Sequence, residues 1–81
     1  MLITWDEPKR VANLVKHGMD FADLDVGFFE AARIIGAKRG RFQALGRFAD
    51  GTIAVVFASL GTEAISVISM RPASASERKL L

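Results

Sequence analysis

The sequence predicts an α+β domain in which an antiparallel β-meander packs against an N-terminal αα-hairpin and a short C-terminal helix. Before residue 31 apolar residues recur at helical spacing, and after it they alternate in strand-like segments separated by turns. Near the end of the chain, a proline and then a serine–glutamate pair stop the last strand and open a helix. With 81 residues, 51% of them hydrophobic, the chain can build one core, so residues 1–81 are expected to form a single domain.

The αα-hairpin is expected to follow a short strand at residues 2–5. Its first helix begins after Asp6, a suitable N-cap, and ends at Gly18, which readily adopts the left-handed conformation. Asp20 caps a second helix after a very short connection. The apolar residues at helical spacing are Val11, Leu14 and Val15 in the first helix, and Phe21, Leu24 and Phe28 in the second. Asn13 is unusual within a helix, and it either bonds a neighbouring loop or faces solvent.

Four strands are expected after the hairpin, at residues 32–37, 41–48, 52–59 and 65–70. The second of them alternates, with Phe42, Ala44, Gly46 and Phe48 on one face and Arg41, Gln43 and Arg47 on the other. Pro72 lacks a backbone N–H and ends the last strand. Ser74 and Glu77 then form a capping box, which places Arg71 on a stiff corner beside the positive end of a helix. Such a corner attracts phosphate, although an arginine that simply ends a strand in water is the alternative.

Charge is distributed unevenly along the chain. Residues 1–30 carry six acidic and three basic side chains, whereas residues 31–81 carry three acidic and eight basic ones, for a net charge of +2. This asymmetry indicates one face for a polyanion and another for a basic or neutral partner. A solvated surface with uneven charge is the alternative.

Composition also excludes several classes of site. The absence of cysteine and the single histidine exclude a disulfide framework and a thiolate or histidine-rich metal site, so no metal and no cofactor are expected. No apolar run reaches the roughly 20 residues that span a bilayer, and residues 1–4 lack the basic start of a signal peptide. The expected location is cytoplasmic, without a membrane partner.

Several short motifs occur in a fixed order along nearly the whole chain. They are Trp5-Asp6-Glu7, Lys9, Asn13, Lys16-His17-Gly18, Phe21, Arg41-Phe42, Leu45-Gly46-Arg47, Ile68-Ser69-Met70-Arg71 and Glu77-Arg78. Together they resemble the BrnT family of toxins from bacterial type II toxin–antitoxin modules. The resemblance implies a RelE-like fold and a ribonuclease that inhibits translation. It also implies a BrnA-type antitoxin that neutralises the toxin, with DNA bound only indirectly, when the pair represses its own promoter.

Metal-independent cleavage of RNA requires a base for the 2′-OH, stabilisation of the phosphorane and an acid for the 5′-oxygen. Arginine suits the second task because its planar fork pairs with phosphate oxygens. The catalytic candidates are therefore Arg71, Arg41 and Arg78, expected to converge at one end of the sheet, with His17 or Lys16 as the general base. For His17 and Lys16, stabilisation of the helix C-terminus is the alternative role. Glu77 is not a candidate base, because its role in the capping box with Ser74 already explains it.

The remaining candidates concern binding. Arg47, Arg39, Lys38 and Ser69 are expected to contact RNA, although a serine in a sheet more often bonds the backbone or water. Leu80 and Leu81 either pack back on the sheet or form part of the antitoxin-binding surface. A second hypothesis is a catalytically inactive BrnT-like module that binds a protein partner or nucleic acid. Ala75 and Ser76 favour it, since the family often has basic residues at these positions.

Overall fold

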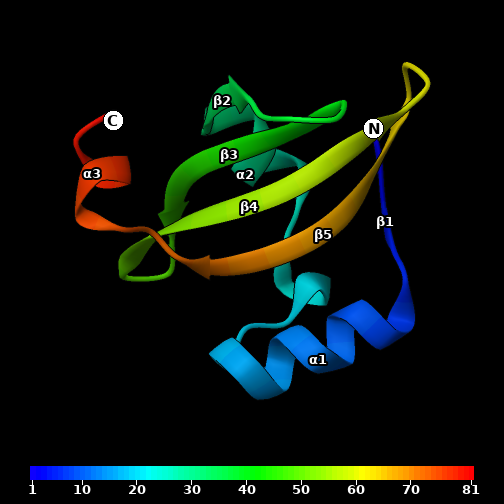
Figure 1. Cartoon of the computed structure of the whole chain (residues 1–81), viewed down its shortest axis with the longest axis horizontal. Coiled ribbons are helices and arrows are strands. Elements are labelled where there is room, and N and C mark those ends of the chain that lie inside the picture. Colours follow the sequence, from blue (N-terminus) through cyan, green and yellow to red (C-terminus); the bar gives the residue numbers. More distant parts are fainter.

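The computed structural model describes all 81 residues, which form a five-stranded sheet flanked by short helices (Figure 1). The elements are β1 (Leu2–Trp5), α1 (Glu7–His17), the 3₁₀ turn η1 (Phe21–Asp23), α2 (Val26–Ala31), β2 (Arg33–Gly36), β3 (Arg41–Phe48), β4 (Gly51–Leu60), β5 (Ala64–Pro72) and α3 (Ala75–Arg78). The strand order is β1-β5-β4-β3-β2. Strands β2 to β5 form the predicted antiparallel meander, and β1 adds a parallel strand beside β5. The mixed α+β class is therefore confirmed.

The second half of the predicted αα-hairpin is not one helix. Asp20 accepts a hydrogen bond from the Ala22 N–H at 2.9 Å and caps only the 3₁₀ turn η1. Leu24 is extended, and Asp25 then accepts from the Phe28 N–H at 2.9 Å to cap α2. Two aspartates within six residues each start a helix of their own, because a short carboxylate bonds the backbone two or three residues ahead. The apolar side chains of this segment reach the core from two separate turns.

One face of the sheet, the core face, is covered by η1 and α2. It carries Phe42, Ala44, Gly46, Ile53, Val55, Phe57, Ile65, Val67 and Met70. All seven aromatic residues pack in or against this core, namely Trp5, Phe21, Phe28, Phe29, Phe42, Phe48 and Phe57. Gly46 permits the close approach of α2, since a Cβ there would lie 3.0 Å from Cε1 of Phe28.

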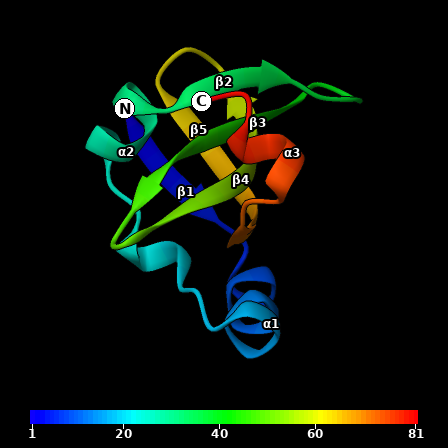
Figure 2. The ribbon, with the colours of Figure 1, turned by 90° about the vertical axis from the view of Figure 1, so that its left-hand side faces the viewer.

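The opposite face, here called the basic face, is only partly covered. It carries Arg33, Arg41, Gln43, Leu45, Arg47, Ala54, Val56, Ser66, Ser69 and Arg71. Helix α3 lies on this side, opposite α2 (Figure 2), and its Glu77 bonds Gln43 and Arg71 of this face. Leu45 and Ala54 are fully buried. The predicted alternation of β3 is thus confirmed, with its arginines turned away from the core.

A β-bulge in β5 decides which residues reach the basic face. Val56 pairs with Ser69 whereas Phe57 pairs with Val67, so Ile68 has no partner on β4. Because side chains alternate along a strand, the extra residue reverses the faces of everything that follows it. Met70 consequently enters the core, and Arg71 joins the basic face.

Helix α1 lies along the edge of β5 (Figure 1), where Asn13 replaces a missing strand. Strand β1 ends at Trp5, opposite Val67, so the backbone of Met70 has no β1 partner. The Asn13 side chain accepts from the Met70 N–H at 3.0 Å and donates to the Met70 carbonyl at 2.9 Å. It also donates to the carbonyl of Met19 at 3.0 Å, which confirms the loop hydrogen bond and makes the solvent-facing alternative wrong.

The apolar residues of α1 predict the helix correctly but do not face the core. Val11, Leu14 and Val15 are all exposed, and Asn13 is the one buried residue of this helix. An ion pair of 3.0 Å between Arg10 and Asp20 also joins α1 to the turn that follows it. None of the helices combines the length and apolar character that a membrane crossing requires.

Candidate functional site

The basic face presents guanidinium groups that solvent can reach. Arg33, Arg41 and Arg47 are exposed and form no ion pair, whereas Arg71 pairs with Glu77. The pleat places all four on one side, and the hydrogen bonds from Gln43 and Arg71 to Glu77 show where α3 interrupts that surface. A surface with several unpaired cations and one paired cation suits a polyanion.

Arg71 is held by one edge of its guanidinium and free along the other. Nη1 donates to Oε1 of Glu77 at 2.7 Å and to the Pro72 carbonyl at 3.2 Å, while Nη2 donates to Oε2 of Glu77 at 2.8 Å. These bonds leave Nε–H and the second hydrogen of Nη2 without a protein partner. Those two donors form a fork that matches two phosphate oxygens, and 35% of the side chain is exposed. The ion pair therefore orients Arg71 without sealing it.

Glu77 is the carboxylate that fixes this geometry. It accepts from the Ser74 N–H at 2.8 Å, and Ser74 Oγ in turn accepts from the Glu77 N–H, so the predicted capping box is confirmed. Gln43 of β3 adds a donor at 2.7 Å. The hydrogen bonds from Arg71, then those from the Ser74 N–H and Gln43, lower the pKa of Glu77 to about 2. Glu77 thus stays ionised near neutral pH and is too weak a base to accept a substrate proton.

The expected convergence of Arg41 with Arg71 is wrong. Strands β3 and β5 both run antiparallel to β4, so they run in the same direction. Arg41 begins β3 opposite Ala58, whereas Arg71 lies near the end of β5 opposite Ala54. The two arginines therefore occupy opposite ends of the basic face.

Other cations sit at each end of that face. Arg47 pairs with Thr52 and so lies at the Arg71 end, nearer to Arg71 than Arg41 is. Arg78 of α3 belongs to the same end, where Nη1 donates to the Ala73 carbonyl at 2.9 Å. Lys38 and Arg39 are exposed in the β2–β3 hairpin at the Arg41 end, and Arg39 adopts φ 64° in this turn.

A cleft between α1 and β5 gathers three of the predicted residues. It encloses about 240 Å³, and its lining comprises Lys9, Ala12, Asn13, Lys16, His17, Ile68 and Ser69. Lys16 and His17 belong to the last turn of α1, which Gly18 ends in the left-handed conformation. Ser69 of β5 faces them because the bulge has turned it out of the core. The cleft thus places an imidazole, two ammonium groups and a hydroxyl together.

The cleft adjoins Arg71. Ser69 and Arg71 both lie on the basic face, two residues apart along β5, which is about 7 Å in an extended strand. Two features of this arrangement were missed by the sequence interpretation. The bulge is signalled by the adjacent apolar residues Val67 and Ile68, which break the alternation, and the α1–β5 contact is signalled by the mid-helix Asn13.

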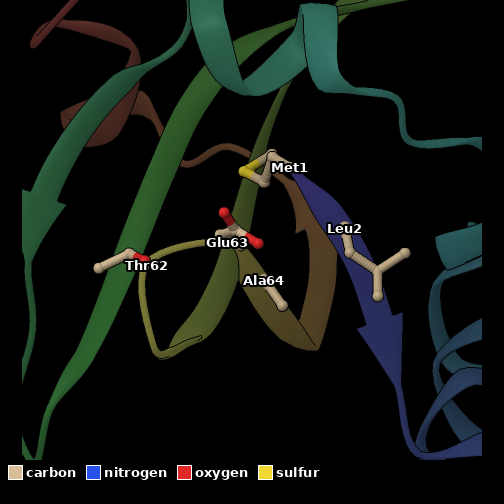
Figure 3. A pocket seen from close by; sticks show the side chains of 5 residues that line it. All are labelled: Met1, Leu2, Thr62, Glu63 and Ala64. Atoms are coloured by element: carbon tan, nitrogen blue, oxygen red, sulfur yellow. The ribbon is translucent and has the colours of Figure 1, made fainter.

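The larger hollow of the protein lies elsewhere. It encloses about 680 Å³ between the start of β1 and the β4–β5 turn (Figure 3). Its lining consists of Met1, Leu2, Thr62, Glu63 and Ala64, and contains no lysine or arginine. It adjoins the beginning of β5, whereas Arg71 lies at the end. No group of three or more histidine, aspartate or glutamate side chains gathers in a way that would hold a metal ion.

The two C-terminal leucines follow α3 and remain on the surface. The Leu80 N–H donates to the Glu77 carbonyl at 3.0 Å, which extends α3 by a turn. Leu80 is 45% exposed and Leu81 is 56% exposed. Both leucines therefore keep about half of their surface open to solvent.

Comparison with known proteins gives two matches of nearly full length. The family model described as "Ribonuclease toxin, BrnT, of type II toxin-antitoxin system" matches residues 5–77. The 1.1 Å crystal structure of the Brucella abortus ribonuclease toxin BrnT is similar with a TM-score of 0.87 and 53% sequence identity, over 91% of this chain and 97% of that one. No curated protein sequence matches the chain. The family match includes the α1–β5 cleft and the Arg71–Glu77 pair, whereas Arg78 and both C-terminal leucines lie beyond it.

Proposed function

The chain belongs to the BrnT family of ribonuclease toxins from type II toxin–antitoxin systems, and from this premise we propose that it is a metal-independent endoribonuclease that inhibits translation. One observation carries the proposal: the free edge of Arg71 lies on a basic face beside a cleft that holds Lys16 and His17. This arrangement offers both phosphate recognition and groups that can transfer protons.

Each residue has a role in the proposed reaction. The Nε and Nη2 hydrogens of Arg71 bind the scissile phosphate and stabilise the charge that develops on the phosphorane. His17 or Lys16 removes the proton of the 2′-OH as this oxygen bonds to phosphorus, and the other of the two protonates the 5′-oxygen as the P–O5′ bond breaks. Ser69 donates to a phosphate oxygen. Arg78 supports the corner at Ala73 and contributes positive charge at the same end.

The remaining cations bind the RNA backbone. Arg47 lies at the Arg71 end, and Arg41 lies at the far end with Lys38 and Arg39. RNA that follows the basic face would meet these groups in sequence. We therefore assign Arg41 to binding and not to the chemical step, because its strand position places it far from Arg71.

A direct assay tests the proposal. Purified protein is incubated with total RNA in buffer that contains EDTA, and the fragment ends are analysed. We expect discrete fragments with 2′,3′-cyclic phosphate ends, because an internal 2′-OH attack needs no metal. Intact RNA with salt-sensitive retardation would instead indicate the inactive binding module, which the occupation of one Arg71 edge by Glu77 favours.

The antitoxin is proposed to be of the BrnA type and to hold the toxin inactive in the cytoplasm. Any contact of the toxin with DNA would be indirect, through this complex. Leu80 and Leu81 are exposed beside α3 and supply apolar surface for the antitoxin. The double variant Leu80→Ser, Leu81→Ser should weaken co-purification with the antitoxin. Val11→Ser, Val15→Ser on α1 is the matched control, and loss of binding in the control alone would place the interface on α1.

A further inference from the structure

Asn13 connects the two elements that form the cleft. The residue is 7% exposed, and its side chain makes three hydrogen bonds, two with the backbone of Met70 and one with the Met19 carbonyl. Met70 stands between Ser69 and Arg71 on β5. The carboxamide of Asn13 thus binds both the N–H and the carbonyl of Met70. These two bonds fix the position of α1 along β5.

The neighbours of Asn13 on α1 are the charged residues of the cleft. Lys9, Lys16 and His17 lie four residues before it and three and four residues after it, so all share one face of the helix. Any rotation or sliding of α1 about Asn13 therefore moves these groups relative to Ser69 and Arg71.

Besides its chain connection to β1 and the hydrogen bond from Trp5 to Glu7, few directional contacts hold α1 against the sheet. Val11, Leu14 and Val15 are 47%, 38% and 84% exposed, so the apolar packing of this helix is partial. The Arg10–Asp20 pair joins α1 to η1 and not to the strand that bears Arg71. Hydrogen bonds are directional, and the amide fits one position only, whereas apolar packing would tolerate small shifts.

We propose that Asn13 is a positioning residue for RNA cleavage: it sets the distance between the proton-transfer groups of α1 and the phosphate-binding arginine of β5. This inference rests on the proposed ribonuclease activity. Asn13 itself touches no substrate. RNA affinity comes from the arginines of the basic face, so loss of Asn13 should lower kcat and leave KM nearly unchanged.

The test compares Asn13→Asp with the core variant Phe29→Leu. The aspartate keeps the oxygen that accepts from the Met70 N–H but turns an acceptor toward the carbonyls of Met70 and Met19. Phe29 lies in α2 against Phe57, remote from the cleft lining, and its truncation lowers stability without touching α1. Both variants are assayed for RNA cleavage at a temperature where circular dichroism shows them fully folded.

We expect Asn13→Asp to lower kcat roughly 10- to 100-fold with KM within about twofold, while Phe29→Leu keeps both constants. If Asn13→Asp does not fold, Asn13→Ala carries the same comparison, since water in the cleft can reach the freed Met70 groups. A kcat for the Asn13 variant equal to that of Phe29→Leu would overturn the positioning role and leave the ribonuclease proposal intact. Absence of cleavage by the wild-type protein would overturn both.

Discussion

The core face and the basic face of the sheet are built by the same strands yet differ in almost every respect. The core face is apolar, and all seven aromatic rings pack in or against the core that it forms. The basic face carries four arginines, and α3 covers only part of it. Stability therefore depends mainly on the first face, and the charges of the second are left for a ligand.

The bulge at Ile68 determines which side chains of β5 lie on which face. Without it, strict alternation from Val67 would direct Ser69 and Arg71 into the core and Met70 out of it. The bulge, which accommodates one unpaired residue, thus places basic instead of apolar side chains on this face. The site depends on this local irregularity as much as on the residue types.

The largest expected effect comes from exchanging two residues that the bulge directs to opposite faces. Met70 is fully buried in the core and Arg71 lies on the basic face. The double variant Met70→Arg, Arg71→Met would bury a guanidinium and expose a methionine, and the expected loss in the free energy of unfolding is comparable with the roughly 5–15 kcal/mol that stabilises a domain. The variant should be insoluble or lack a cooperative thermal transition by circular dichroism. A soluble variant that melts cooperatively near the wild-type temperature would show that the bulge does not determine the faces.

Truncation of a single core side chain should have the next largest effect on the free energy of unfolding. Phe21 is fully buried, and Phe21→Ala should lower the free energy of unfolding by about 3–5 kcal/mol. Urea denaturation followed by fluorescence of Trp5, whose ring lies 6.4 Å from that of Phe21, measures it. A loss below about 1 kcal/mol would mean that the core face does not dominate stability.

Acid should weaken the Arg71–Glu77 ion pair, which connects the basic face to α3. The folded-state pKa of Glu77 is about 2, below its ordinary value of 4.5, so its contribution is present above pH 4.5 and is lost as the pH falls towards 2. After allowance for partial exposure of Arg71, the loss is about 2 kcal/mol. Urea denaturation at pH 6 and pH 3 should show a little over half of this loss in the wild type, because the folded-state pKa lies below pH 3. The difference in Glu77→Gln should be smaller. Equal differences in both proteins would assign the acid sensitivity to other carboxylates.

The smallest effect on stability is expected from the free arginines. Arg33→Gln and Arg41→Gln remove exposed, unpaired side chains, so unfolding free energies should change by less than about 0.5 kcal/mol. RNA affinity should fall, and the slope of log K against log salt should decrease by roughly 0.7 for each phosphate group that the variant no longer neutralises. Unchanged affinity and slope in both variants would remove the basic face as the RNA surface.

Local patterns predicted much of the fold. The alternation of β3, the cap at Ser74 and the stop at Gly18 each depend on neighbouring residues, and each is confirmed. The break between η1 and α2 was missed because Asp20 and Asp25 compete as caps, and the sequence pattern alone does not rank them. The parallel pairing of β1 with β5 joins residues more than 60 positions apart, which no local pattern specifies.

The candidate site was predicted only in part. The residue types were identified, but their grouping depends on strand direction and on the bulge. Placing Arg41 beside Arg71 contradicts the meander itself, in which the start of β3 and the end of β5 lie at opposite ends. The grouping of Lys16 and His17 with Ser69 depends on Asn13 and a strand edge, neither of which periodicity reveals.

The most direct measurement compares RNA cleavage by Arg71→Gln and Glu77→Gln. Both variants lose the same ion pair, so both should melt at similarly lowered temperatures, and stability cannot explain a difference in rate between them. Only Arg71→Gln loses the fork of Nε and Nη2 hydrogens, and its cleavage rate should fall roughly 100-fold or more, with Glu77→Gln within about fivefold of the wild type. Equal rates for the two folded variants would contradict a phosphate-binding role for the free edge of Arg71.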